Sequence, residues 1–156
     1  MQPFVSIPGV VDVTVIRGAA ADPDGAPALL IEIPHGATRT VDYTALASRL
    51  TSPLPDGLVD FFHVNTDIGA PELALAVAER VVAAAPTRAV AVLRCLIPRT
   101  LIDCNRRLEA SLADFRAGKV TPGLMPWVTV DDDRALLREL HQTYVAAVTA
   151  DRKSVV

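Results

Sequence analysis

Runs of apolar residues, some alternating with polar residues and some continuous, predict three strands. Between residues 10 and 17, valines alternate with polar residues, which is the period of a strand with one buried face. Residues 29–33 and 89–97 are largely continuous apolar runs rich in β-branched residues, a pattern typical of buried strands. Residues 19–27 are rich in Asp, Pro, Gly and Ala, so the first two strands are predicted to form a hairpin.

Helical patterns separate and follow these strands, at residues 43–50, 71–85, 108–117 and 131–150. Thr40 or Asp42 can cap the first helix. In the second, Pro71 suits the first turn and Glu72 the positive end of the helix dipole. Its buried stripe is predicted to be Leu73, Val77, Val81 and Val82.

Together these patterns predict an α/β fold with a mixed, mostly parallel central sheet flanked by helices. One domain covers residues 1–150, and residues 151–156 are expected to be an unstructured tail. The chain has 156 residues, of which 51% are hydrophobic, enough to build a core.

The composition excludes several classes of partner. A net charge of -3 gives no electrostatic basis for binding nucleic acid or an anionic membrane. No apolar run reaches the roughly 20 residues of a membrane span, and no signal-peptide pattern opens the chain. Cys95 and Cys104 lie in apolar segments, and their spacing matches no thiolate metal motif. We therefore expect a protein of the reducing cytoplasm.

His35 is the first candidate for chemistry, because it follows directly on the strand predicted at residues 29–33. Pro34 ends that strand, and Gly36 can adopt backbone angles that other residues avoid. Ligands of open α/β sheets bind at the carboxyl ends of strands. His35 is therefore either a metal ligand, an acid/base, or a turn residue that ends the strand.

Two polar clusters offer partners for His35. His63, Asn65, Thr66 and Asp67 precede the predicted helix at 71–85, where Asp67 could equally be a cap. Catalytic zinc takes about three protein ligands, and His35 with the His63/Asp67 pair supplies two, leaving the third open. His141 lies on the last predicted helix, where packing explains it.

The second cluster follows the strand at 89–97 and contains Arg94, Arg99, Asn105 and Arg106. Its arginines could bind a carboxylate in bidentate fashion. Alternatively, Asp103 could pair with Arg99 or Arg106 in a structural ion pair.

Three segments in this order resemble the N-formylglutamate amidohydrolase family, zinc-dependent hydrolases related in fold to the zinc carboxypeptidases. They are Ile33-Pro-His-Gly-Ala37, His63-Val-Asn-Thr-Asp-Ile-Gly-Ala-Pro-Glu-Leu-Ala-Leu-Ala-Val-Ala78 and Pro98-Arg-Thr-Leu-Ile-Asp-Cys-Asn-Arg106. The last is similar to the family's Ser-Arg-hydrophobic-hydrophobic-Asp-hydrophobic-Asn-Arg signature and is the most specific. His141-Gln-Thr-Tyr-Val-Ala-Ala is similar to a family helix that carries a histidine near an aromatic residue. The likeness spans residues 29–150.

The resemblance implies a fold like the N-terminal part of the zinc-carboxypeptidase-like (phosphorylase/hydrolase-like) fold. It implies zinc, or another divalent metal, bound by His35 and Asp67, with His63 as the fallback ligand. Asn105 and Arg106 would bind the substrate carboxylate with help from Arg99. Asp103 would orient that arginine, and His141 would play a supporting part. The implied reaction is hydrolysis of the amide of N-formylglutamate or a related carboxylate-bearing N-acyl amino acid by metal-activated water.

Two departures from the family pattern limit this implication. After its histidine the family has Asn or Ser with Pro-Glu, where this chain has Thr38-Arg-Thr-Val-Asp42. The family also continues to a further strand with an Asp-x-His segment that supplies the last zinc ligand, followed by a catalytic carboxylate. The sequence therefore predicts a C-terminally incomplete domain that lacks its general acid/base. The alternatives are a catalytically incomplete carboxylate-binding or interaction module, or a subunit whose sheet edge another chain completes, as in a homo-oligomer.

Overall fold

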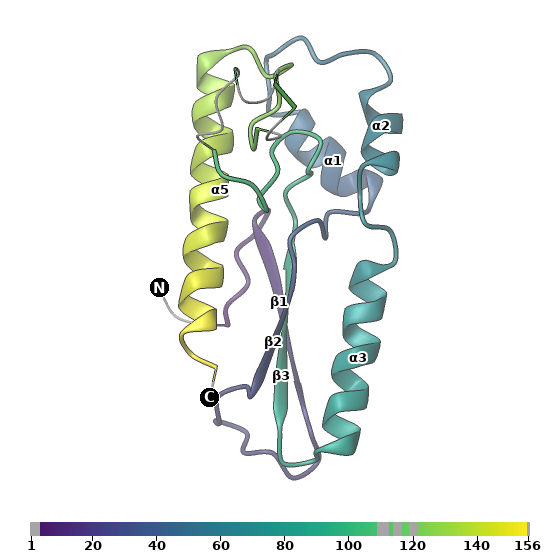
Figure 1. The fold of residues 1–156 in the computed structure, drawn as a ribbon, viewed down its shortest axis with the longest axis vertical. Coiled ribbons are helices and arrows are strands. Elements are labelled where there is room, and N and C mark those ends of the chain that lie inside the picture. Colours follow the sequence, from purple (N-terminus) through teal and green to yellow (C-terminus); the bar gives the residue numbers. More distant parts are fainter. Residues whose placement is uncertain (1–3, 109–112, 114–116, 119–121, 156) are drawn as a thin grey trace.

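The fold is built on a three-stranded mixed sheet (Figure 1). The computed structural model describes residues 4–108, 113, 117–118 and 122–155. The strands are β1 (Val11–Arg17), β2 (Leu29–Ile33) and β3 (Ala89–Cys95), in the spatial order β1-β3-β2. The three predicted strands and the α/β class are thus confirmed.

The predicted hairpin between β1 and β2 is wrong, because β3 lies between them. β1 pairs with β3 in antiparallel fashion and β2 pairs with β3 in parallel. β3 is the most apolar of the three strands, and the central position buries every residue of it except Arg94. Since one pairing is parallel and the other antiparallel, the described sheet is mixed but not mostly parallel.

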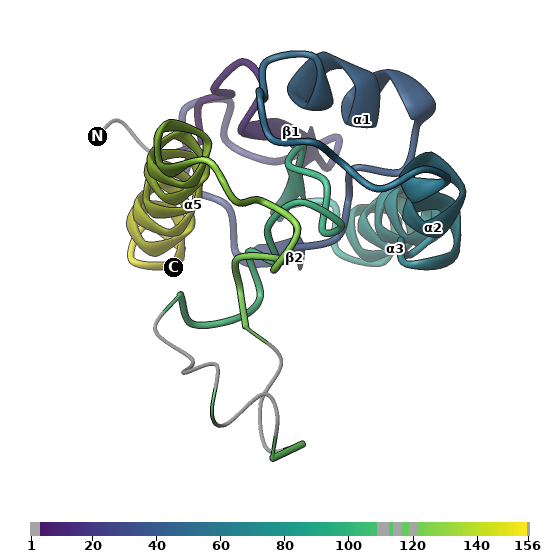
Figure 2. The same ribbon diagram turned by 90° about the horizontal axis from the view of Figure 1, so that it is seen from above.

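Helices cover both faces of this sheet, as Figures 1 and 2 show. On one face, α3 (Ala70–Ala84) packs against β2 and β3 around Ile33, Ala78, Val90 and Val92. On the other face, the larger cluster joins α5 (Asp131–Arg152) and the shorter helices α1 (Thr40–Ala47) and α2 (Leu58–Val64) to the sheet.

The predicted buried stripe of α3 is wrong at most of its positions, because the face that is buried lies one residue further along the sequence. Its buried residues are Pro71, Ala74, Ala78 and Val82, whereas Leu73 is 66% exposed and Val77 42% exposed. Only Val82 of the predicted stripe is buried, and Val81 packs partly against this cluster. The alanines have the smallest side chains on the helix and let its axis approach the sheet closely.

Two helix predictions need correction at their ends. The first helix begins at Thr40, not at residue 43, and Asp42 reaches back to the backbone N–H of Arg39 at 3.1 Å. The last helix extends to Arg152, so the predicted tail at 151–156 begins inside it. Asp151 is buried and accepts a hydrogen bond from the N–H of Phe4 at 2.7 Å.

Helix α2 was not predicted, since its seven residues follow a proline-rich stretch. It starts after Gly57, whose φ of 74° favours glycine, and buries Leu58 and Phe62 one turn apart. The helix predicted at 108–117 lies largely outside the described residues. Among the helices that are described, none has the length and apolar character needed to cross a membrane.

Candidate functional site

His35 is held at the carboxyl end of β2 by the close approach of two backbones. A side chain on Gly36 would place its Cβ 2.6 Å from Cγ of Arg94 and 3.0 Å from the carbonyl oxygen of Cys95. Gly36 has no positive φ, so its missing side chain matters here, not the backbone freedom expected from the sequence. Nε of Arg94 donates to the Gly36 carbonyl at 2.7 Å. These contacts fix the backbone that carries the imidazole.

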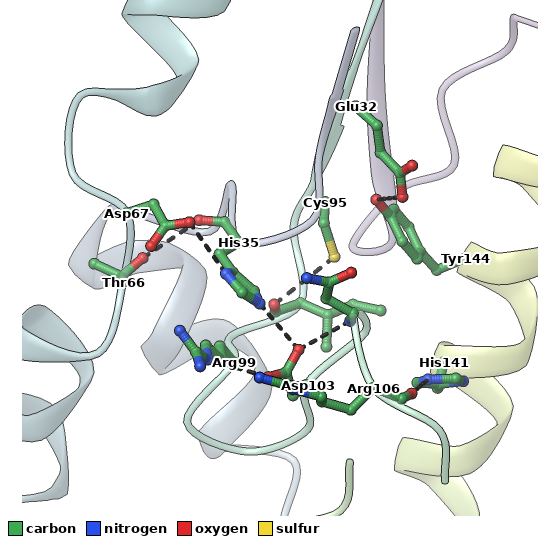
Figure 3. A network of polar contacts seen from close by, with 12 residues as sticks. Glu32, His35, Thr66, Asp67, Cys95, Arg99, Asp103, Arg106, His141 and Tyr144 are labelled. Atoms are coloured by element: carbon green, nitrogen blue, oxygen red, sulfur yellow. Dashed lines mark hydrogen bonds and ion pairs between the residues drawn. The ribbon is translucent and has the colours of Figure 1, made fainter. Parts of the chain in front are cut away.

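The imidazole of His35 lies between two carboxylates (Figure 3). Its Nε2 is 2.9 Å from Oδ1 of Asp103, and its Nδ1 is 3.1 Å from Oδ2 of Asp67. Asp103 is fully buried, whereas the side chain of Asp67 is 53% exposed. His35 therefore joins a buried acceptor on one side to a solvent-accessible one on the other.

Asp103 organises several donors around one buried carboxylate. Besides His35, it accepts the backbone N–H of Asn105 at 2.9 Å and Nε of Arg99 at 3.1 Å. Nε of Arg106 lies 3.8 Å away. Both ion pairs considered from the sequence are thus present, and the one with Arg99 is the closer. The expected contact of Asp103 with an arginine is observed, and its contact with His35 is additional.

The protonation of this pair follows from the same contacts. The hydrogen bond to Asp103 raises the pKa of His35 above its ordinary value, against the opposing effect of burial. Burial opposes ionisation of Asp103, but the hydrogen bonds from His35 and Asn105 and the nearby charges outweigh it and lower the pKa of Asp103. Without a metal, the arrangement therefore favours an imidazolium that donates to both carboxylates.

Asp67 is brought to His35 by the turn that precedes α3. Oγ1 of Thr66 donates to the Ala37 carbonyl at 2.8 Å, which ties this turn to the segment after His35. The backbone N–H of Ala70 bonds to the carbonyl of Asp67 at 3.0 Å and closes the turn. Asp67 therefore lies beside His35 because two loop segments are joined by backbone and hydroxyl contacts.

His63 does not join this pair. It lies on α2, where Nε2 is 3.4 Å from Oγ1 of Thr40 and the ring packs against Phe62. In the part of the chain that the structure describes, no three His, Cys, Asp or Glu side chains are grouped so as to hold a metal ion. His35 and Asp67 are the only two of the candidate ligands that the described structure places in contact.

The residues predicted to bind a carboxylate separate into two places on either side of Asp103. Arg99 lines a pocket of about 240 Å³ with Phe61 and Trp127, which sequence reasoning did not single out. Asn105 and Arg106 line a second pocket, of about 340 Å³. Arg94 lines neither pocket. Its guanidinium pairs with Asp42 at 3.1 Å.

His141 supports the second of these pockets. It is buried on α5, and its Nε2 lies 2.9 Å from the backbone carbonyl of Arg106. Nearby, the hydroxyl of Tyr144 donates to Oε1 of Glu32 at 2.9 Å and joins α5 to β2 (Figure 3). His141 thus lies where a residue that positions the Arg106 backbone would lie.

The two cysteines lie close to this region. Cys95 ends β3 and Cys104 follows Asp103; both are buried, as predicted, and neither forms a disulfide within the described structure.

In comparisons with known proteins, no family model, curated protein or solved structure matches the chain. The function is therefore inferred from the geometry of these residues and from the resemblance of the three sequence segments.

Proposed function

We propose that this protein is a zinc-dependent amidohydrolase of the N-formylglutamate amidohydrolase type, which hydrolyses the amide of an N-acyl amino acid. The observation that carries the proposal is the position of His35 between Asp67 and Asp103. A metal-binding histidine usually donates its second ring N–H to a carboxylate, which fixes the ring and raises its basicity. Asp103 offers that acceptor to Nε2 and leaves Nδ1 for a metal.

The separation of His35 and Asp67 suits two ligands of one ion. Nitrogen and oxygen ligands bind zinc at about 2.0–2.2 Å, so two of them at a tetrahedral angle lie about 3.3–3.6 Å apart. Nδ1 of His35 and Oδ2 of Asp67 are 3.1 Å apart. Asp67 is accessible to solvent, as a metal site that admits water and substrate requires.

Each residue then has a separate task. His35 and Asp67 would hold the ion, which when bound polarises the scissile carbonyl and activates water. Asp103 would keep the His35 ring oriented. Arg99 would hold the substrate carboxylate through its guanidinium, and Asn105 and Arg106 remain candidates for a second polar contact.

The metal content of purified, dialysed protein tests this proposal directly. We expect about one zinc ion per chain in the wild type, and loss of the ion in His35→Ala and Asp67→Asn. His63→Ala is the matched control, because that histidine contacts Thr40 instead. Formate release from N-formyl amino acids should follow zinc content. A wild-type protein that holds no zinc, and whose stability a chelator does not change, would refute the assignment.

A second candidate function is a non-catalytic carboxylate-binding module. It is favoured by the observation that only two candidate ligands meet among the described residues, since a two-ligand site binds zinc weakly. Calorimetric titration with an N-acyl amino acid in the presence of chelator separates the two. Binding that needs Arg99 or Arg106 but no zinc supports the module, whereas binding that disappears with the metal supports the enzyme.

A further inference from the structure

We propose that the pocket beside Arg99 binds an apolar side chain of the substrate, so that the preferred substrates are N-acyl derivatives of aromatic or large aliphatic amino acids. This inference rests on the proposed function and assigns its substrate class. The pocket is lined by Phe61, Asn65, Arg99, Pro122, Met125, Pro126 and Trp127. No carboxylate and only one cation is among these residues.

The size of the pocket suits one side chain. Its volume of about 240 Å³ is below the roughly 300–1,000 Å³ of pockets that bury a whole drug-sized ligand. Arg99 lies on its wall and also contacts Asp103, which contacts His35. A ligand whose carboxylate pairs with Arg99 would therefore place its side chain among the aromatic rings.

One aromatic wall of the pocket, Trp127, is anchored by a hydrogen bond. Nε1 of Trp127 donates to the carbonyl of Thr100 at 3.0 Å, so the indole is tied to the residue next to Arg99. Phe61 meets Trp127 edge to face, with ring centroids 6.1 Å apart and planes at 89°. An anchored indole provides apolar contact area without a large loss of conformational entropy on binding.

Arg99 has hydrogen-bonding capacity left for a ligand. Within the described part of the chain its hydrogen bond runs from Nε to Asp103, and its terminal nitrogens form none. These terminal N–H groups suit a carboxylate at the mouth of the pocket.

The same walls discriminate against a glutamate side chain. A second carboxylate placed between Phe61 and Trp127 would lose its hydration, and the one cation among the described lining residues, Arg99, would already be paired with the first carboxylate. An aromatic or branched aliphatic side chain gains contact area there instead. The pocket thus favours one amino-acid class through apolar burial and disfavours the other through desolvation.

Trp127 is the sole tryptophan, so its fluorescence reports on ligands in this pocket without any need for turnover. We would titrate the full chain, with zinc and with chelator, using N-acetyl-phenylalanine, N-acetyl-glutamate and N-acetyl-phenylalaninamide. We expect a saturable change with N-acetyl-phenylalanine, at least about tenfold tighter than with either of the others. Equal dissociation constants for the phenylalanine and glutamate derivatives would overturn the inference.

Variants test the two parts of the pocket separately. Phe61→Ala should weaken N-acetyl-phenylalanine about tenfold and leave N-acetyl-glutamate unchanged, since Phe61 is 45% exposed and its removal spares the core. Val64→Ala is the control, because Val64 lies on the same helix, is 82% exposed and does not line the pocket. Arg99→Gln should weaken both carboxylates but not the amide. Unchanged affinity in Phe61→Ala would refute the assignment.

The titrations separate this inference from the proposed function. Selective binding of N-acetyl-phenylalanine by a protein that never holds zinc would refute the amidohydrolase but keep the pocket assignment. Zinc-dependent formate release without that selectivity would support the amidohydrolase but refute the pocket assignment.

Discussion

Nε2 of His35 lies 2.9 Å from Oδ1 of Asp103, a carboxylate with no exposure to solvent. The two residues are 68 positions apart, and the backbones that carry them come from the turn after β2 and from the loop after β3. A buried carboxylate on one ring nitrogen fixes the ring plane and leaves the other nitrogen on the side of Asp67.

Asp103→Asn should weaken zinc binding about 10–100-fold, the usual effect of removing a carboxylate behind a metal-binding histidine. The amide has nearly the same shape but holds the imidazole less strongly. Competition with a zinc-binding dye measures the affinity, and circular dichroism checks that the variant folds. Asp133→Asn is the matched control, because Asp133 is also a buried carboxylate with several hydrogen bonds but bonds to Thr51 and Ser52 instead of His35. Equal zinc affinity in the two variants would contradict a supporting role for Asp103.

Gly36→Ala should lower the free energy of unfolding by about 1–3 kcal/mol, the usual cost of overpacking. The added methyl group would lie 2.6 Å from Cγ of Arg94 and 3.0 Å from two backbone carbonyls, of which only the arginine side chain can move easily. Urea unfolding measures the change. In Gly25→Ala the nearest atom is Cβ of Asp22, at 3.0 Å in an exposed loop, so that variant should lose less. The same loss in both would argue against close packing at His35.

Thr100→Val should raise the free energy of unfolding by about 1–2 kcal/mol, because it removes a buried hydroxyl whose desolvation is uncompensated. Thr100 is fully buried, and its Oγ1 has no hydrogen-bond partner among the described residues. Thr66→Val is the comparison, since the Thr66 hydroxyl donates to the Ala37 carbonyl at 2.8 Å and its loss should destabilise. Chemical denaturation of both variants measures the two changes in the free energy of unfolding, which should have opposite signs. A destabilised Thr100→Val would show that its hydroxyl has a partner.

The stabilising contribution of Asp133 should be lost in acid. Hydrogen bonds from Ser52 and Thr51 lower the pKa of Asp133, against the opposing effect of burial. Because the folded pKa lies below the unfolded value of about 3.9, this stabilisation is complete above that pH and is lost as the pH falls through the folded pKa.

Unfolding free energies of wild type and Asp133→Asn, measured between about pH 2 and pH 7, test this prediction. The variant should be less stable than wild type near neutral pH, and the two should converge in acid. A constant difference across the whole range would contradict the proposed linkage.

Local sequence patterns determined much of the fold. Apolar runs located the three strands because burial selects β-branched residues in strands whatever their neighbours are. Pro71 and Glu72 marked the start of α3, since a helix N-terminus has the same chemistry in any fold. His35 was correctly placed at the end of β2, because Pro34 stops the strand without any tertiary contact.

Only the tertiary structure decided which segments meet. Alternation along a strand identifies its buried face but not its neighbour, so nothing local placed β3 between β1 and β2. The contact of His35 with Asp103 depends on that order, because the parallel pairing of β2 with β3 brings both strand ends to one edge. By sequence Asp67 was the expected partner and His63 the fallback, and the turn before α3 brings only Asp67 to the imidazole. Chemistry could be predicted from residue types, but contact could not, since it is set by packing between distant segments.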